Sequence, residues 1–151
     1  MDSLEPAHLR GPTGESNVLS LAPRGVVLCL GPQADDALEQ MLAALVAGNT
    51  ALVVADGAAD MAERLANAGL PVFGLDGHVD ADALRDLANI AAVACCADQN
   101  SNQRIKRALA ARPGPLIALL DDDDTALECL SVERHLCIDT TAAGGNATVL
   151  A

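Results

Sequence analysis

Aromatic side chains are almost absent from this sequence of 151 residues, which contains one phenylalanine and neither tryptophan nor tyrosine. Sites that stack nucleobases or sugar rings, or that cage quaternary cations, depend on such rings. The composition therefore excludes them. Positive charge is also scarce, because 9 basic residues stand against 21 acidic ones and leave a formal net charge of −12. Such a chain repels phosphate groups, so we expect neither a nucleic-acid partner nor a membrane-surface partner.

Long apolar runs are missing too. No run reaches the ~20 residues that a membrane-spanning helix needs, and residues 1–10 lack the apolar centre of a signal peptide. The 5 cysteines include no CxxC pair, and the 3 histidines lie far apart. This spacing favours neither a metal site nor catalysis by a Cys–His pair. With 51% hydrophobic residues, the chain can build a core, and we expect a soluble, cytoplasmic protein.

Short apolar runs alternate with segments of helical periodicity from residue 24 to residue 120. The run Gly25–Gly31 is apolar throughout, which is typical of a strand buried on both faces. The predicted strands are 25–31, 50–55, 71–75, 90–95 and 115–120, and the predicted helices are 35–47, 58–68, 80 or 81–89, and 101–111. This alternation predicts an α/β fold, a Rossmann-like doubly wound parallel sheet of about five strands. The order of the strands does not follow from the sequence.

The segments on either side of this core differ from it in composition. Residues 1–23 show no sustained period and are predicted to be a leader or linker, before a Rossmann-like domain over 24–131. Residues 132–151 are predicted to form a C-terminal strand and a tail. In the strand, 132–139, Leu136 and Ile138 share one face. The tail carries no charge and contains two adjacent glycines, which suits backbone that approaches another surface closely.

Carboxylates gather where ligands of this fold class bind, at the carboxyl ends of the predicted strands. The first loop, Gly31–Asp36, is not a GxGxxG motif, and its two aspartates oppose a phosphate at the helix N-terminus. Further aspartates follow the other strands, at positions 56, 60, 76, 80, 98 and 121–124. We therefore predict no dinucleotide binding and interpret the aspartates as helix caps. The alternative is a free-standing receiver-like domain, or one that binds a cation or small ligand at this acidic edge, although no lysine follows the fifth strand.

Residues 21–50 resemble the opening of the cofactor-binding domain of aldehyde dehydrogenases, through Pro23, Gly25-Val26-Val27 and Ala47–Thr50. Two functional motifs of that family are changed. Gln33–Asp35 stands where the family has Pro-Trp-Asn, whose asparagine helps to form the oxyanion hole. Ala55–Gly57 stands where it has Lys-Pro-Ser, whose lysine contacts the cofactor ribose. The resemblance thus implies an aldehyde-dehydrogenase-like domain with neither catalytic nor cofactor-binding residues.

Three further stretches, Gly11–Asn17, Leu21–Gly25 and Glu133–Ala147, are similar to the carboxyl-terminal region of the proline utilization A family. That family joins an FAD-dependent proline dehydrogenase to an NAD-dependent L-glutamate γ-semialdehyde dehydrogenase, and its longer members end in a non-catalytic domain. The resemblance implies that FAD and NAD belong to the parent oxidoreductase and that this chain holds no cofactor. It also implies that the partner is the aldehyde dehydrogenase domain of the same polypeptide.

The resemblance further implies which residues meet that partner. In the family, the terminal motif packs over the internal cavity through which the intermediate passes between the active sites, and the preceding strand pairs with the flap of the dehydrogenase domain. The implied interface and lid residues are Arg134, His135, Cys137, Asp139, Thr140, Thr141, Ala142, Ala143, Gly144, Gly145, Asn146 and Ala147. An active oxidoreductase within this chain is the interpretation least favoured, because the cofactor loops differ.

Overall fold

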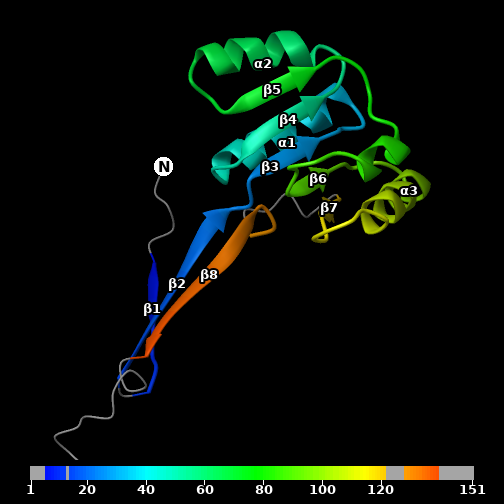
Figure 1. The fold of residues 1–151 in the computed structure, drawn as a ribbon. Coiled ribbons are helices and arrows are strands. Elements are labelled where there is room, and N and C mark those ends of the chain that lie inside the picture. The colour runs from blue at the N-terminus through cyan, green and yellow to red at the C-terminus, as the bar shows by residue number, and fades with distance from the viewer. Residues whose placement is uncertain (1–5, 13, 122–127, 140–151) are drawn as a thin grey trace, which may run out of the picture. The chain divides into compact units, whose positions relative to one another are not determined.

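A computed structural model describes residues 6–12, 14–121 and 128–139 of the chain. The chain divides into two compact units, one built mainly from residues 23–131 and the other from the segments on either side of them. The larger unit contains a five-stranded parallel sheet, and the smaller one a three-stranded sheet (Figure 1). No helix among the described residues is long and apolar enough to cross a membrane.

The sheet of the larger unit has the strand order β5-β4-β3-β6-β7. Its strands are β3 (Val26–Cys29), β4 (Thr50–Val54), β5 (Val72–Leu75), β6 (Ala92–Ala94) and β7 (Ala118–Leu120), and each neighbouring pair is parallel. The chain therefore starts in the middle of the sheet, moves to one edge and returns to build the other half. This order matches five of the six strands of the Rossmann sheet, 3-2-1-4-5 of the order 3-2-1-4-5-6. The predicted fold class is confirmed, and the structure adds the strand order that the sequence left open.

Helices cover both faces of this sheet. α1 (Ala34–Val46) and α2 (Ala58–Asn67) pack on one face, where Val27 and Cys29 of β3 are buried against residues such as Met41. α3 (Gln99–Ala110) packs on the other, where Leu28 is buried with Ile105. Successive residues of β3 thus enter opposite cores, which is why its run is continuously apolar rather than alternating.

The segment between β5 and β6 corrects one prediction. In place of an α-helix from residue 80 or 81 to 89, the structure has a short 3₁₀ helix, η1 (Ala81–Arg85). Its one fully buried apolar residue is Leu84, and the next leucine, Leu87, is three positions further on. A spacing of three suits a 3₁₀ turn as well as an α-helix, so periodicity cannot distinguish the two over so few residues.

The smaller unit corrects another prediction, because the described residues among 1–23 form strands where a leader or linker was expected. They contain β1 (Ala7–Leu9) and β2 (Glu15–Pro23), which pair antiparallel with Ala7 opposite Leu19. β8 (Ser131–Asp139) lies on the other side of β2, so the sheet order is β1-β2-β8. The prolines and glycines around β2 are typical of loops, so the sequence pattern did not predict this strand. Its sequence, ESNVLSLAP, also alternates only weakly between polar and apolar residues.

Candidate functional site

The point where ligands usually bind in this fold lies between β3 and β6, where the strand order reverses. In this chain, backbone hydrogen bonds close the crevice between the loops that follow β3 and β6. The Leu30 amide donates to the Ala94 carbonyl oxygen at 2.9 Å, and the Cys96 amide donates to the Gly31 carbonyl oxygen at 2.8 Å. The loops after the two strands are therefore joined directly, at the place where a bound ligand would have to separate them.

Gln40 of α1 completes this closure. Its side chain is 2% exposed and forms two hydrogen bonds with Gly31. Gln40 Oε1 accepts from the Gly31 amide at 3.1 Å, and Gln40 Nε2 donates to the Gly31 carbonyl oxygen at 3.0 Å. Gly31 itself has φ +80, and a Cβ there would lie 2.6 Å from the Gln33 carbonyl oxygen. A side-chain amide thus satisfies both backbone groups of Gly31.

The aspartates at the carboxyl edge of the sheet act on helix N-termini. Asp36 accepts from the Gln33 amide at 3.0 Å at the start of α1, and Asp76 accepts from the Ala59 amide at 3.0 Å at the start of α2. Asp80 accepts from the Asp82 amide at 3.2 Å at the start of η1. These carboxylates satisfy backbone donors that have no partner within their helices, which is the capping role predicted from the sequence.

Asp98 is the most fully bonded of these caps. Its Oδ1 accepts from the Asn100 amide at 2.9 Å and from the Ser101 amide at 3.2 Å, and the Ser101 hydroxyl donates to Oδ2 at 2.6 Å. The hydrogen bond from the Ser101 hydroxyl, helped by those from the backbone, lowers the pKa of Asp98 below its ordinary value. A carboxylate held ionised at the N-terminus of α3 opposes the binding of a phosphate there.

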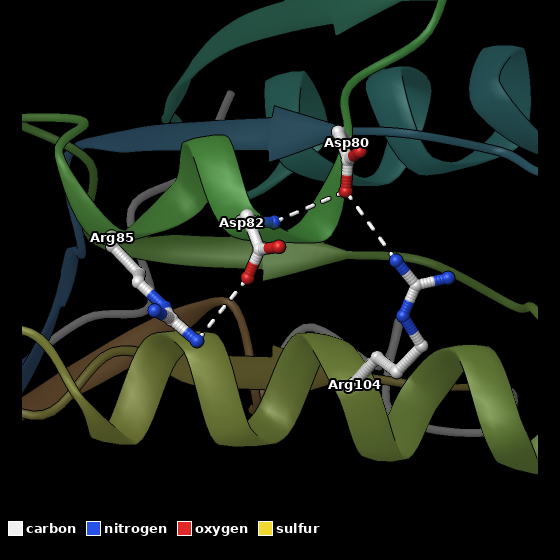
Figure 2. Close-up of polar contacts among 4 residues, drawn as sticks. All are labelled: Asp80, Asp82, Arg85 and Arg104. Carbon is white, nitrogen blue, oxygen red and sulfur yellow. Dashed lines mark hydrogen bonds and ion pairs between the residues drawn. The ribbon is translucent and has the colours of Figure 1, made fainter.

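Two exposed ion pairs involve η1 and its N-cap residue Asp80 (Figure 2). Arg104 of α3 reaches Asp80 at 3.5 Å, and Arg85 reaches Asp82 within η1 at 3.2 Å. The side chains are more than half exposed, so each pair adds little to stability. Asp80 is nevertheless shared between the η1 cap and α3, which makes it a structural residue rather than an open ligand group.

A receiver-like cation site would need several of these acids close together. Within the described part of the chain, no three His, Cys, Asp or Glu residues are grouped so that they could hold a metal ion. Of the predicted acidic run 121–124, only Asp121 falls within the described residues, and its carboxylate pairs with Lys106 at 2.8 Å. The geometry therefore offers the receiver-like alternative no support among these residues.

The cysteines of the core are poor nucleophiles. Burial raises the pKa of Cys29 to about 12, and burial is also the main reason why the pKa of Cys95 is raised. A thiol with a raised pKa carries almost no thiolate at neutral pH. Both side chains instead fill the core, in agreement with their position in apolar runs of the sequence.

Asn49 has a role that the sequence analysis missed. It belongs to the Ala47–Thr50 turn, and its side chain is 1% exposed. Its Oδ1 accepts from the Gly25 amide at 3.0 Å, and its Nδ2 donates to the Leu130 carbonyl oxygen at 2.9 Å. Asn49 thus fixes the start of β3 to the segment that leads into β8. A polar residue between a glycine and a β-branched residue in an otherwise apolar stretch was the available signal.

The predicted interface residues fall into two groups. Arg134, His135, Cys137 and Asp139 lie on β8, where all four are exposed, whereas residues 140–147 lie outside the described residues. β8 holds one side of its backbone against β2, and the Ser20 hydroxyl donates to the Arg134 carbonyl oxygen at 3.4 Å. The sequence resemblance implies a partner for this strand in another domain but not its pairing with β2.

β8 also exposes apolar side chains. Leu136 and Ile138, on one face of the strand, are 57% and 49% exposed. β8 is the last strand in the order β1-β2-β8 of the described residues, so its outer backbone edge pairs with no other described strand. An exposed strand edge with apolar side chains is the kind of surface that another strand or domain covers.

No family model matches this chain. Among curated proteins, it is 36% identical over 147 residues to the bifunctional protein PutA of Salmonella typhimurium, and this match covers 94% of the chain and 11% of that protein. It is 32% identical over 153 residues to the bifunctional protein PutA of Rhizobium meliloti, with 95% of the chain and 12% of that protein covered. The chain therefore spans about a tenth of the length of the curated relatives it matches.

Solved structures give the same result. A mutant of proline utilization A (PutA) from Bradyrhizobium japonicum matches with a TM-score of 0.65 and 31% identity, over 78% of this chain and 13% of that one. PnpE in complex with nicotinamide adenine dinucleotide matches with a TM-score of 0.62 and 21% identity, over 78% of this chain and 26% of that one, and this likeness concerns the fold alone. The resemblance predicted from the sequence is confirmed.

Proposed function

We propose that this chain, a homologue of one segment of the bifunctional PutA proteins, is a non-catalytic domain of a cytoplasmic enzyme that converts proline to glutamate. In this proposal FAD and NAD bind elsewhere in the parent enzyme. The domain covers the flap of the aldehyde dehydrogenase part with β8 and closes the substrate-channelling cavity with residues 140–147. Its task is to keep the intermediate inside the protein between the two active sites.

The observation that carries this proposal is the exposed outer strand of the smaller sheet. Leu136 and Ile138 are about half exposed on β8. Burying them against a partner removes apolar surface from water, at roughly 25 cal/mol per Å². A partner strand would also satisfy the outer backbone groups of β8, as in other cases of strand addition.

The features of the larger unit favour a domain that covers another domain over one that catalyses a reaction. Gln40 fills the cofactor crevice, and carboxylates cap the helix N-termini that would otherwise face a phosphate. The core cysteines are held as thiols by burial. Within this unit, Asn49 accepts from the Gly25 amide and donates to the Leu130 carbonyl oxygen, which are structural contacts.

Hydrogen exchange on β8 tests the proposal. In a polypeptide that joins this domain to both dehydrogenases, the outer-edge amides of residues 132–139 should exchange at least about ten-fold more slowly than in the isolated chain. Replacing Leu136→Lys and Ile138→Lys should abolish that difference, because two buried charges would oppose docking. Leu116→Lys, at a position of the larger unit that is 88% exposed, is the matched control and should preserve it.

Equal exchange of β8 in the isolated chain and in the long polypeptide would overturn the proposal. So would protection that survives both lysine substitutions, because the apolar face of β8 would then not be the docking surface.

A further inference from the structure

A polar hollow lies beside the closed crevice, at the carboxyl ends of β6 and β7. It has a volume of about 400 Å³, within the range of pockets that hold small molecules. Ala97, from the loop after β6, forms one wall, and Asp121, directly after β7, forms another. The third wall is α3. The hollow thus occupies the edge of the sheet where ligands of α/β folds bind, but one strand away from the crevice that Gln40 fills.

One face of α3 turns into this hollow. Gln99, Asn102, Gln103 and Lys106 line it, at helix positions i, i+3, i+4 and i+7. Residues at this spacing lie above one another on one side of a helix. This face offers three side-chain amides and one ammonium group but no aliphatic residue, so it suits a polar ligand rather than an apolar one.

Asn102 contributes an unsatisfied group. Its Oδ1 atom is buried and has no hydrogen-bond partner. A buried acceptor without a donor costs free energy, and such groups in folded proteins usually have a reason to be there. Because this oxygen has almost no accessible surface, a ligand in the hollow could reach it only after the Asn102 side chain turned toward the hollow.

Both signs of charge are present. Lys106 Nζ lies 2.8 Å from Asp121 Oδ2, and their side chains are 56% and 30% exposed. A lysine beside a carboxylate can bind the two ends of a zwitterion, with Lys106 against a carboxylate and Asp121 against an ammonium group. A phosphate or a simple dicarboxylate would meet the Asp121 charge without compensation. A nucleobase would find no ring on which to stack among the lining residues.

We propose that this hollow binds a small amino acid in its zwitterionic form. Lys106 holds the ligand carboxylate, Asp121 accepts from its ammonium group, and the amides of Gln99 and Gln103 contact its side chain. The site is independent of the covering role proposed above, because it uses only residues of the larger unit and none of β8.

The test is a titration of the full chain followed by amide chemical shifts. The compounds are L-glutamate, L-proline and glycine, with acetate and methylamine as fragments that carry only one of the two charges. We expect at least one amino acid to shift the amides of residues 97–106 and 121 in a saturable way. We expect acetate and methylamine to bind at least about ten-fold more weakly, because each can satisfy only one end of the site.

Two variants assign the effect to the proposed groups. Lys106→Met should weaken amino-acid binding by about ten-fold or more, whereas Arg107→Met, the same charge change at the neighbouring exposed position, should leave it unchanged. Three results would overturn the proposal: no saturable shift with any of the amino acids, acetate binding as tightly as the amino acids, or unchanged binding in Lys106→Met.

Discussion

At the scale of single residues, one glutamine decides what the larger unit can bind. Gln40 lies in a helix whose exposed face carries Glu39, yet it is itself 2% exposed, and its side chain pairs with both backbone groups of Gly31. The helical period places position 40 on the buried face with Ala37 and Met41, but a polar residue there is interpreted as surface. The burial of Gln40 follows from the packing of α1 against the loop after β3, which the sequence does not show.

Replacing Gln40→Ala should lower the free energy of unfolding by about 2 kcal/mol, because the buried Gly31 amide loses its acceptor. Equilibrium urea denaturation measures this change. Glu39→Ala, the adjacent exposed position of the same helix, should change the stability by less than about 0.5 kcal/mol. If both variants lost the same stability, the hydrogen bonds of Gln40 would not be what closes the crevice.

At the scale of the elements, the sequence predicts some features well and others poorly, for physical reasons. β3 and β4 are apolar on both faces, and the helices that follow have clear 3.6-residue periods, so all of them were predicted. β2 was not, because its side chains are only partly buried and its apolar pattern is correspondingly weak. The aspartates could be recognised as caps from their positions after strands. The partner of each cap was not visible, because Asp76 reaches α2 from a different loop.

The contact between β5 and α2 shows what pattern alone cannot resolve. Gly74 of β5 lies so close to α2 that an added Cβ would be 2.2 Å from the Ala58 carbonyl oxygen and 2.6 Å from the Ala62 Cβ. In the sequence this glycine merely weakens the strand prediction. In the structure, the missing side chain of Gly74 allows α2 to approach β5 closely. The sequence alone does not show which element makes that approach.

Gly74→Ala should therefore destabilise the chain by about 1–3 kcal/mol, because α2 must move away from the sheet to admit the methyl group. Thermal or urea unfolding measures the loss. Leu75→Ala is the matched control in the same strand, since its side chain is 60% exposed and its loss should cost about 0.5 kcal/mol or less. A neutral Gly74→Ala variant would show that β5 and α2 are less tightly packed than described.

At the scale of the whole molecule, the Rossmann-type sheet of the larger unit does not by itself establish a dinucleotide site. The net charge is −12, carboxylates cap the helix N-termini, and Gln40 bonds both backbone groups of Gly31. Fold and function therefore have to be argued separately in this chain.

The isolated chain should accordingly bind neither NAD nor NADP with a dissociation constant at or below about 100 μM, equivalent to roughly −5.5 kcal/mol. Titration calorimetry at low salt is the stringent measurement, because weak charge screening would reveal any attraction for phosphate. A saturable isotherm in this range would contradict the assignment of Gln40 and the capping aspartates.

The proposed role of this domain, which is to keep an intermediate inside the parent enzyme, is tested by the coupled reaction. In a polypeptide that carries this domain with both dehydrogenases, we would delete residues 140–151 and, separately, replace Gly144→Val, whose β-branched side chain blocks close backbone approach. The measurement is the lag before NADH appears when proline is supplied. We expect both variants to oxidise proline at the unchanged rate but to show a longer lag, because the intermediate escapes before it reaches the second site. A lag unchanged by the deletion would contradict the account and leave the domain without a role in channelling.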